Sequence, residues 1–264
     1  MNIRLCIISC KQELFDDAAK TALDNATGEI SLVGFGNGVP LGFPSGVDGH
    51  TEHSPTNRGV PYGLHRLWDI CKDLWPDPPD EEILCYIHDD FQILEKGWDQ
   101  RVKAVFARDP RCGLAGFGGA TALGGDEIYS AAYEVHQLGR RNFYSNMHGA
   151  EVHGERTTEE RPIVFTDGQS MILRRDLLDK ILGWSWWPFD LIHHAYDYGI
   201  ACQARRHGYT AWLVPCEVNH LNFQTASQPV YKELAASHGG DAAVHAASHR
   251  FVYDTFRDVL PLRL

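Results

Sequence analysis

The chain has 264 residues, a formal net charge of −11, 44% hydrophobic residues and 22% charged residues. This length and composition are ordinary for a globular protein with one large core. The acidic charge disfavours non-specific binding to nucleic acid or anionic membrane, and no apolar run approaches the ~20 residues of a membrane helix. Seven cysteines lie mostly in apolar runs without a C-x-x-C pair, which favours buried thiols in the reducing cytoplasm.

The N-terminal segments predict a strand–helix–strand unit. Residues 3–9 are a β-branched apolar run without the cleavage site of a signal peptide, so we expect a buried strand there. Helical spacing of apolar residues over 13–26 and a second apolar run over 29–36 complete the unit, which implies a parallel sheet. The Gly- and Pro-rich residues 36–63 predict a long functional loop, followed by a helix over 64–75.

The next strand is predicted within 81–98, which reads EEILCYIHDDFQILEKGW. Its apolar residues at 83–87 lead directly into His88-Asp89-Asp90. A helix at 98–108 and a strand at 112–120 are expected next, followed by irregular structure at 120–162. After these we expect a strand–turn–strand–helix unit at 162–184 and a helix at 190–208 closed by Gly208. A last strand at 209–220 and a weakly helical tail end the chain.

Two adjacent carboxylates at the end of a buried strand need an explanation. Such charges must be solvated, paired or metal-bound, because unpaired buried charge is costly. Ligands of α/β sheets bind at the carboxyl ends of strands, and Mg²⁺ takes carboxylate oxygens together with substrate phosphates. Asp89 and Asp90 therefore suit a metal–diphosphate site. The alternative is a strand that leaves the core, with Asp opening a turn.

The residues around this strand resemble the GT-A glycosyltransferases, in particular the GT2-like group. The metal motif of that family, often written D-x-D, lies at a strand end, and His88-Asp89-Asp90 fits an H-x-D variant. Four further segments resemble the family in order and spacing over roughly 220 residues: IRLCIISCKQE at the N-terminus, NRG at 57–59, VFTDGQSMILRRDLLDKI at 164–181 and YDYGIACQARRHGY at 196–209, with a late His in VPCEVNH at 214–220.

The resemblance implies an α/β GT-A fold, a mostly parallel central sheet flanked by helices. It implies a catalytic domain over 1–225, with a nucleotide-sugar half at 1–118 and an acceptor half at 119–225. Residues 226–264 would form a C-terminal helical tail.

The resemblance also assigns roles to single residues. Asp90 and His220 would bind a divalent metal, Mn²⁺ or Mg²⁺, with Asp89 as a further ligand or a partner of the donor, and Asp197 would be the catalytic base of an inverting reaction. The expected donor-binding residues are Ser9, Cys10, Asn57, Arg58, His88 and Asp89, and the expected acceptor-binding residues are Asp167, Gly168, Trp186 and Trp187. The two tryptophans equally suit a core, because indoles bury a large area.

The function implied is transfer of a sugar from a UDP-, GDP- or dTDP-sugar to a hydroxyl of a glycan, a lipid-linked glycan, a protein or a modified nucleobase. Transfer to hydroxymethylated phage DNA would require a basic groove, with candidates at Arg140, Arg141, Arg156, Arg174, Arg175, Arg205 and Arg206. A nucleotidyltransferase is a second reading. A sugar-binding module without activity is a third, because Tyr196 and Gly199 stand where the family usually has acidic residues.

Two histidine pairs stand outside these assignments. His193-His194 are expected on a helix surface, with the acceptor site as the alternative. His245 and His249 lie four residues apart, but no Glu follows His245, so the metalloprotease pattern is absent and we expect surface residues.

Overall fold

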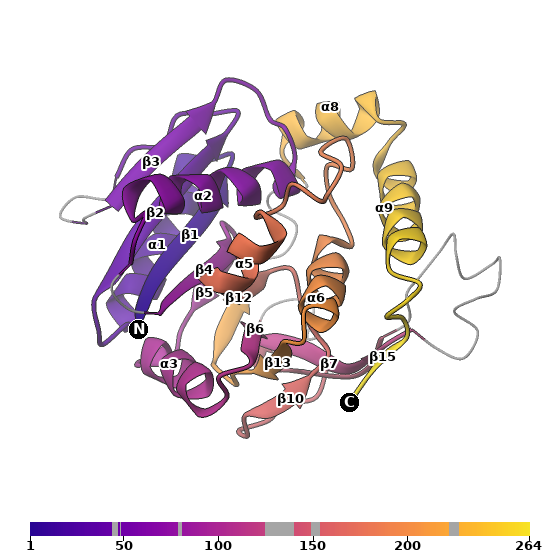
Figure 1. Ribbon diagram of the computed structural model, residues 1–264. Helices are drawn as coiled ribbons and strands as arrows, with labels where there is room; N and C mark the ends of the chain where they lie inside the picture. The colour runs from indigo at the N-terminus through magenta and orange to yellow at the C-terminus, as the bar shows by residue number, and fades with distance from the viewer. Residues whose placement is uncertain (44–46, 48, 79–80, 125–139, 149–153, 222–226) are drawn as a thin grey trace.

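The computed structural model describes residues 1–43, 47, 49–78, 81–124, 140–148, 154–221 and 227–264. A central sheet (Figure 1) has the strand order β10 (Arg161–Ile163), β13 (Thr210–Leu213), β6 (Cys112–Gly116), β12 (Ser170–Arg174), β4 (Glu82–His88), β1 (Asn2–Ser9), β2 (Ile30–Asn37) and β3 (Gly49–Ser54). Only β12 and β10 run antiparallel to their neighbours in this sheet of the described chain. The predicted mostly parallel α/β architecture is therefore confirmed.

Helices cover both faces of this sheet because its central strands are apolar on both sides. In β1, Leu5 and Ile7 pack into one core cluster and Cys6 and Ile8 into another. The first cluster includes residues of α1 (Gln12–Asn25) and α3 (Trp98–Arg108), and the second includes residues of α2 (Val60–Leu74), α5 (Arg175–Ile181), α6 (Tyr196–Arg206) and α9 (Asp241–Thr255).

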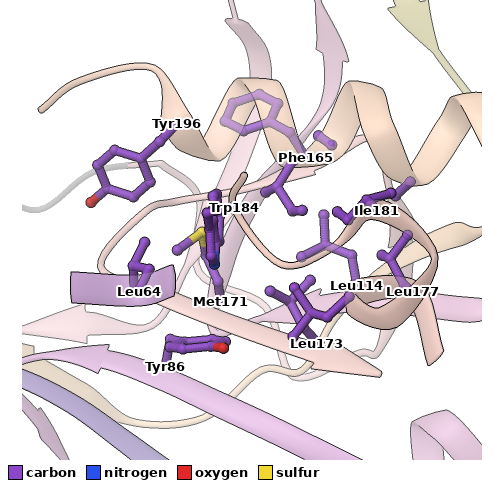
Figure 2. Packing of buried hydrophobic residues seen from close by; sticks show 14 of the residues in the cluster. Leu64, Tyr86, Leu114, Phe165, Met171, Leu173, Leu177, Ile181, Trp184 and Tyr196 are labelled. Carbon is purple, nitrogen blue, oxygen red and sulfur yellow. The ribbon is translucent and has the colours of Figure 1, made fainter. Parts of the chain in front are cut away.

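The second cluster is partly drawn in Figure 2. Trp184 is fully buried and lies among side chains from several elements, including Tyr86 of β4 and Met171 of β12. Tyr196, the first residue of α6, lies at the edge of this group with its hydroxyl directed away from Leu177 of α5. The Tyr196 hydroxyl therefore points out of this cluster, toward His88 at the end of β4.

Two smaller sheets complete the fold. One contains β5 (Phe91–Ile93), β14 (Val218–His220) and β9 (Met147–His148), and the other contains β11 (Phe165–Thr166), β7 (Gly118–Leu123), β15 (Leu262–Arg263) and β8 (Arg140–Ser145). The C-terminal segment joins the body of the protein, since β15 pairs with β7 and Val252 and Phe256 are fully buried. In Figure 1, α8 (Pro229–Ser237) and α9 flank the same side of the molecule as α6.

Several element predictions are corrected by the structure. The loop expected at 36–63 contains β3, which extends the sheet edge parallel to β2. The last strand expected at 209–220 is two strands in different sheets, β13 and β14. Pro215 lies between them, and proline has no N–H to continue a ladder.

The helix expected at 190–208 begins only at Tyr196. The cause is local, because His194 and Ala195 have φ values of 63° and 53°, outside the right-handed helical region. Gly208, with φ 78°, follows the helix end as expected. All seven cysteines are buried thiols, which is also as expected. Within the described ranges, no helix combines the length and the apolar character needed to cross a membrane.

Glu82 holds two buried arginines and is expected to be important for stability. Its carboxylate oxygens lie 2.7 Å from Arg4 Nε and 2.7 Å from Arg175 Nη1. Glu82→Gln would leave the buried Arg4 without its counter-charge and Arg175 with only the exposed Asp179, 3.4 Å away, so it should lower the free energy of unfolding by about 3 kcal/mol. Urea denaturation measures this, with Glu13→Gln as the control, since the Glu13 side chain is 77% exposed and its loss should change stability by less than about 1 kcal/mol. Equal midpoints for both variants would contradict the expectation.

Candidate active site

The site forms where three neighbouring parallel strands end. The register pairs Ile8 of β1 with His88 of β4, and Ser9 with Gly36 of β2. Asn37 ends β2 beside them. The antiparallel β12 enters at the same edge, because the His88 N–H donates to the Gln169 carbonyl at 3.1 Å. One edge of the sheet thus gathers side chains from four strands.

Asp89 is anchored by the end of β1. Ser9 Oγ donates to Asp89 Oδ2 at 2.6 Å, and both residues are 2% exposed. Cys10 lines the same cleft, and burial, with the charge of Asp89, raises the pKa of its thiol to about 12. Cys10 is therefore a protonated, apolar wall residue at neutral pH. The structure brings these three predicted donor-side residues together.

Asp90 and His220 meet although 130 residues separate them. The antiparallel pairing of β14 with β5 sets His220 opposite Phe91, and the Leu221 N–H donates to the Asp90 carbonyl at 2.8 Å. This places His220 Nε2 3.2 Å from Asp90 Oδ1. The short second sheet therefore carries the late histidine to the strand-end carboxylate.

His88, Asp90 and His220 fit a divalent metal. Each offers one ligand atom, and these atoms all lie within 4.8 Å of one another. Burial lowers the pKa of His88, so its imidazole is neutral, which is the form that binds metals. Two imidazoles and a carboxylate suit Mn²⁺ or another transition metal.

The cleft around this group has a volume of about 300 Å³ and is acidic. Among the described residues that line it there is neither Lys nor Arg. The lining includes four carboxylates, from Asp89, Asp90, Asp167 and Asp197. An anionic ligand would therefore need a cation to bind here.

Asp197 and Asp167 form a second pair of carboxyl groups in the cleft. Burial, with the nearby charge of Asp167, raises the pKa of Asp197 from 3.8 to about 7. Asp167 itself lies 3.8 Å from Arg140 Nη1. At neutral pH Asp197 is thus poised to accept or release a proton, as a general base requires.

Tyr196 links the helix that carries Asp197 to the strand end. Its hydroxyl lies 2.7 Å from His88 Nε2. Gly168 permits this approach, because a Cβ there would come within 2.9 Å of the Tyr196 hydroxyl. Tyr196 and His88 both depart from the acidic residues usual in the resembled family, and here they contact each other. Gly199 departs for a different reason, because a Cβ at this position would come within 2.7 Å of the Trp186 ring.

The NRG segment is divided by the structure. Asn57 lines the cleft, and its Oδ1 accepts from the Gly59 N–H at 2.9 Å. Gly59 has φ 84°, and a Cβ there would lie 2.5 Å from the Ile192 carbonyl, so only glycine suits this close approach. Arg58 is exposed and stacks on Tyr62 at 4.1 Å, outside the lining of the cleft.

Trp186 and Trp187 lie in the core and do not line the cleft. Trp187 is 1% exposed and donates its indole N–H to the Leu191 carbonyl at 2.8 Å. Trp186 donates to the Gly183 carbonyl at 3.0 Å and packs edge-on against Phe256 of the C-terminal segment. Both indoles therefore pack within the fold, and neither lines the cleft, as the predicted acceptor-binding role would require.

Four residues that line the cleft had no predicted role: Asn37, Gln169, Tyr198 and Tyr231. His193, His194, His245 and His249 also line it. The helix surface expected for His193 and His194 is wrong, because both residues precede α6. The surface position expected for His249 is wrong, because it is only 7% exposed. Its helix, α9, packs along α6 and turns this histidine inward. The four-residue spacing of His245 and His249 was the only signal available.

No protein-family model matches the sequence, and no curated protein matches it significantly. Solved structures do match. S. aureus TarS (residues 1–349) is similar with a TM-score of 0.54 and 12% identity over 97% of this chain and 71% of that one. The mannosyltransferase PcManGT from Pyrobaculum calidifontis, in complex with GDP-Man and Mn²⁺, is similar with a TM-score of 0.51 and 13% identity over 98% of this chain and 74% of that one. The chain has a glycosyltransferase fold. At these identities the likeness establishes the fold alone.

Proposed function

We propose that this protein is a metal-dependent glycosyltransferase that moves a sugar from a nucleoside-diphosphate sugar to an acceptor hydroxyl. The observation that carries the proposal is the pairing of two groups in one cleft: the cation ligands Asp90 and His220, and the near-neutral carboxyl of Asp197. The cation ligands lie at the carboxyl ends of strands, where α/β folds bind ligands, and Asp197 reaches the same cleft from the first turn of α6.

The acidity of the cleft supports a metal-bound donor. A diphosphate placed beside Asp89 and Asp90 would be repelled by both carboxylates, and no cationic side chain is among the described lining residues. A divalent ion held by Asp90 and His220, with His88 adjacent, would offset the charge that develops on the departing diphosphate. Asp89, fixed by Ser9, is the proposed contact to the donor nucleoside.

Asp197 is the proposed base of an inverting reaction. Its carboxylate would take the proton of the acceptor hydroxyl as that oxygen attacks the anomeric carbon and the nucleoside diphosphate leaves. A base is most effective when its pKa is close to the working pH, and the pKa of Asp197 is about 7. Asp167 and Gly168 lie in the same lining, and we propose that they face the acceptor.

The ion pairs of the arginines favour a carbohydrate acceptor over DNA. Arg174 and Arg175 are buried and pair with Glu81 and Glu82. Arg206 pairs with Asp258. These three arginines are therefore engaged within the fold and do not supply a basic groove for a polyanion.

Thermal unfolding with a panel of nucleotide sugars tests the proposed function. Donor and Mn²⁺ together should raise the unfolding temperature by mass action, and either alone should raise it much less. UDP-, GDP- and dTDP-sugars are compared. The GDP-sugar is included because the mannosyltransferase of similar fold is in complex with GDP-Man. A chain that binds no nucleotide sugar with Mn²⁺, or that instead forms one from a nucleoside triphosphate and a sugar phosphate, would contradict the proposal.

The pH dependence of transfer should follow the Asp197 carboxyl. Because its pKa is about 7 and only the deprotonated form accepts a proton, kcat/KM should fall as the pH drops through about 7. Asp167→Asn removes a charge that raises this pKa, so the same limb should move to lower pH. Rate profiles from about pH 5 to 9 measure both. A limb that stays in place in Asp167→Asn would assign the titration to another group.

A further inference from the structure

A second group of potential metal ligands lies at the wall of the cleft, which His193 and His194 line, and has no role in the proposed transfer. His193, His194 and Asp241 offer ligand atoms that all lie within 4.8 Å of one another. None of the three belongs to the Asp90–His220 group. Asp241 begins α9, whereas the two histidines precede α6.

The backbone at His194 and Ala195 adopts an uncommon conformation. His194 and the following Ala195 have φ values of 63° and 53°, although each carries a Cβ. Such conformations cost free energy and persist where the surroundings enforce them, often at functional sites. Here the rings of His193 and His194 lie side by side, with centroids 4.4 Å apart and planes tilted by 32°. The Ser248 hydroxyl also fixes the segment, donating to the His193 carbonyl at 2.7 Å.

Hydrogen bonds orient the potential ligands. Asp241 Oδ1 accepts from the Tyr231 hydroxyl at 2.6 Å and lies 2.9 Å from His194 Nε2. The same hydroxyl lies 2.9 Å from His193 Nδ1. Partners of this kind fix ring orientation and tautomer at metal sites. If Asp241 served only to interact favourably with the helix dipole at the N-terminus of α9, it would not need two histidines and a tyrosine around it.

The chemistry of the surroundings favours a transition metal. The His245 ring lies 5.0 Å from that of His194, and the His249 ring 4.0 Å from that of His245. Imidazole binds metals in its neutral form, through the lone pair of a ring nitrogen. Neutral imidazoles with one carboxylate suit Zn²⁺, whereas Mg²⁺ prefers oxygen ligands.

We propose that His193, His194 and Asp241 form a second cation site that binds a transition-metal ion of the zinc class. The site is independent of the proposed sugar transfer, because it requires only its own ligands. Its ligands come from the segment before α6 and from the start of α9. A bound ion would therefore fasten the C-terminal helices to the wall of the cleft.

Metal binding to the stripped protein tests the proposal. The Asp90→Asn/His220→Ala variant keeps only the second site and should still bind one Zn²⁺ per chain in equilibrium dialysis with metal analysis. Adding Asp241→Asn should abolish that binding, and Tyr231→Phe should weaken it about 10-fold, as loss of an orienting partner does. Co²⁺ offered as a probe should give a visible absorption band in the first variant and none after Asp241→Asn.

The control is His207→Ala, because His207 is an exposed histidine at the end of α6. This change should leave the Zn²⁺ stoichiometry and the zinc-dependent rise in unfolding temperature unaltered. Failure of the Asp90→Asn/His220→Ala variant to bind Zn²⁺ while circular dichroism shows it folded would overturn the proposal, whatever the variant at Asp241 does. Loss of sugar transfer with intact zinc binding would bear only on the proposed function.

Discussion

Asp90→Asn is expected to lower metal-stimulated sugar transfer by about 10³-fold, because a metal bound at this site would stabilise the transition state by several kcal/mol. Asp90 is 2% exposed, and its Oδ1 lies 3.2 Å from His220 Nε2. The substitution removes the charge and leaves the volume nearly unchanged. Initial rates over a range of Mn²⁺ concentrations measure the effect, and the apparent affinity for Mn²⁺ should fall together with the rate.

The matched control for this change is Asp24→Asn. Asp24 is an exposed carboxylate of α1 that pairs with Lys20, so its loss should leave the rate within about 2-fold, as most exposed ion pairs contribute little. His220→Ala should reproduce the Asp90 defect, since both side chains belong to one ligand group. If Asp90→Asn keeps full Mn²⁺-stimulated transfer, the metal lies elsewhere in the cleft.

The strand end at Asp89 and Asp90 could be located from the sequence because it rests on local physics. An apolar run of strand length followed by carboxylates predicts a buried strand that reaches a ligand-binding edge. The structure has that strand, β4, and ends it at His88. The partner His220 could be named only by resemblance, because the β5–β14 pairing that brings it there is a long-range contact.

The C-terminal histidines were misplaced for a related reason. The segment around His249 is rich in alanine, so its hydrophobic pattern does not say which helix face is buried. Packing of α9 along α6 decides that face, and it is set by tertiary contacts between distant segments. The Trp186 and Trp187 indoles show the same limit, since burial and stacking on a ligand require the same residue type.

The contact between Tyr196 and His88 shows what pattern matching alone does not supply. Each residue, taken singly, is a departure from the acidic pattern of the resembled family. In the structure the two departures form one hydrogen bond of 2.7 Å, and Tyr196 occupies the space left by Gly168. A neutral pair in this place adds no further negative charge to a cleft that already holds four carboxylates. The departures are therefore compatible with an active site.

Asp197→Asn is expected to reduce kcat by about 10²- to 10⁴-fold, the usual worth of a general base. The amide keeps the size of the carboxyl and does not accept the acceptor's proton. Mn²⁺ affinity and the thermal shift caused by the donor should remain, because the proposed metal ligands Asp90 and His220 are untouched. Steady-state rates, with Asp73→Asn on the exposed end of α2 as the control, measure the change.

Stability against pH separates a base from a residue needed for folding. The pKa of Asp197 is raised in the folded state from 3.8 to about 7, so ionising this carboxyl costs stability progressively as the pH rises above 3.8. The Asn variant escapes that cost and should be at least as stable as the wild type near pH 8, with the difference shrinking below about pH 4. Slow transfer together with undiminished stability at pH 8 identifies a catalytic role. Full transfer in Asp197→Asn would instead assign the base to another group of the cleft, with Asp167 as the nearest carboxylate to test.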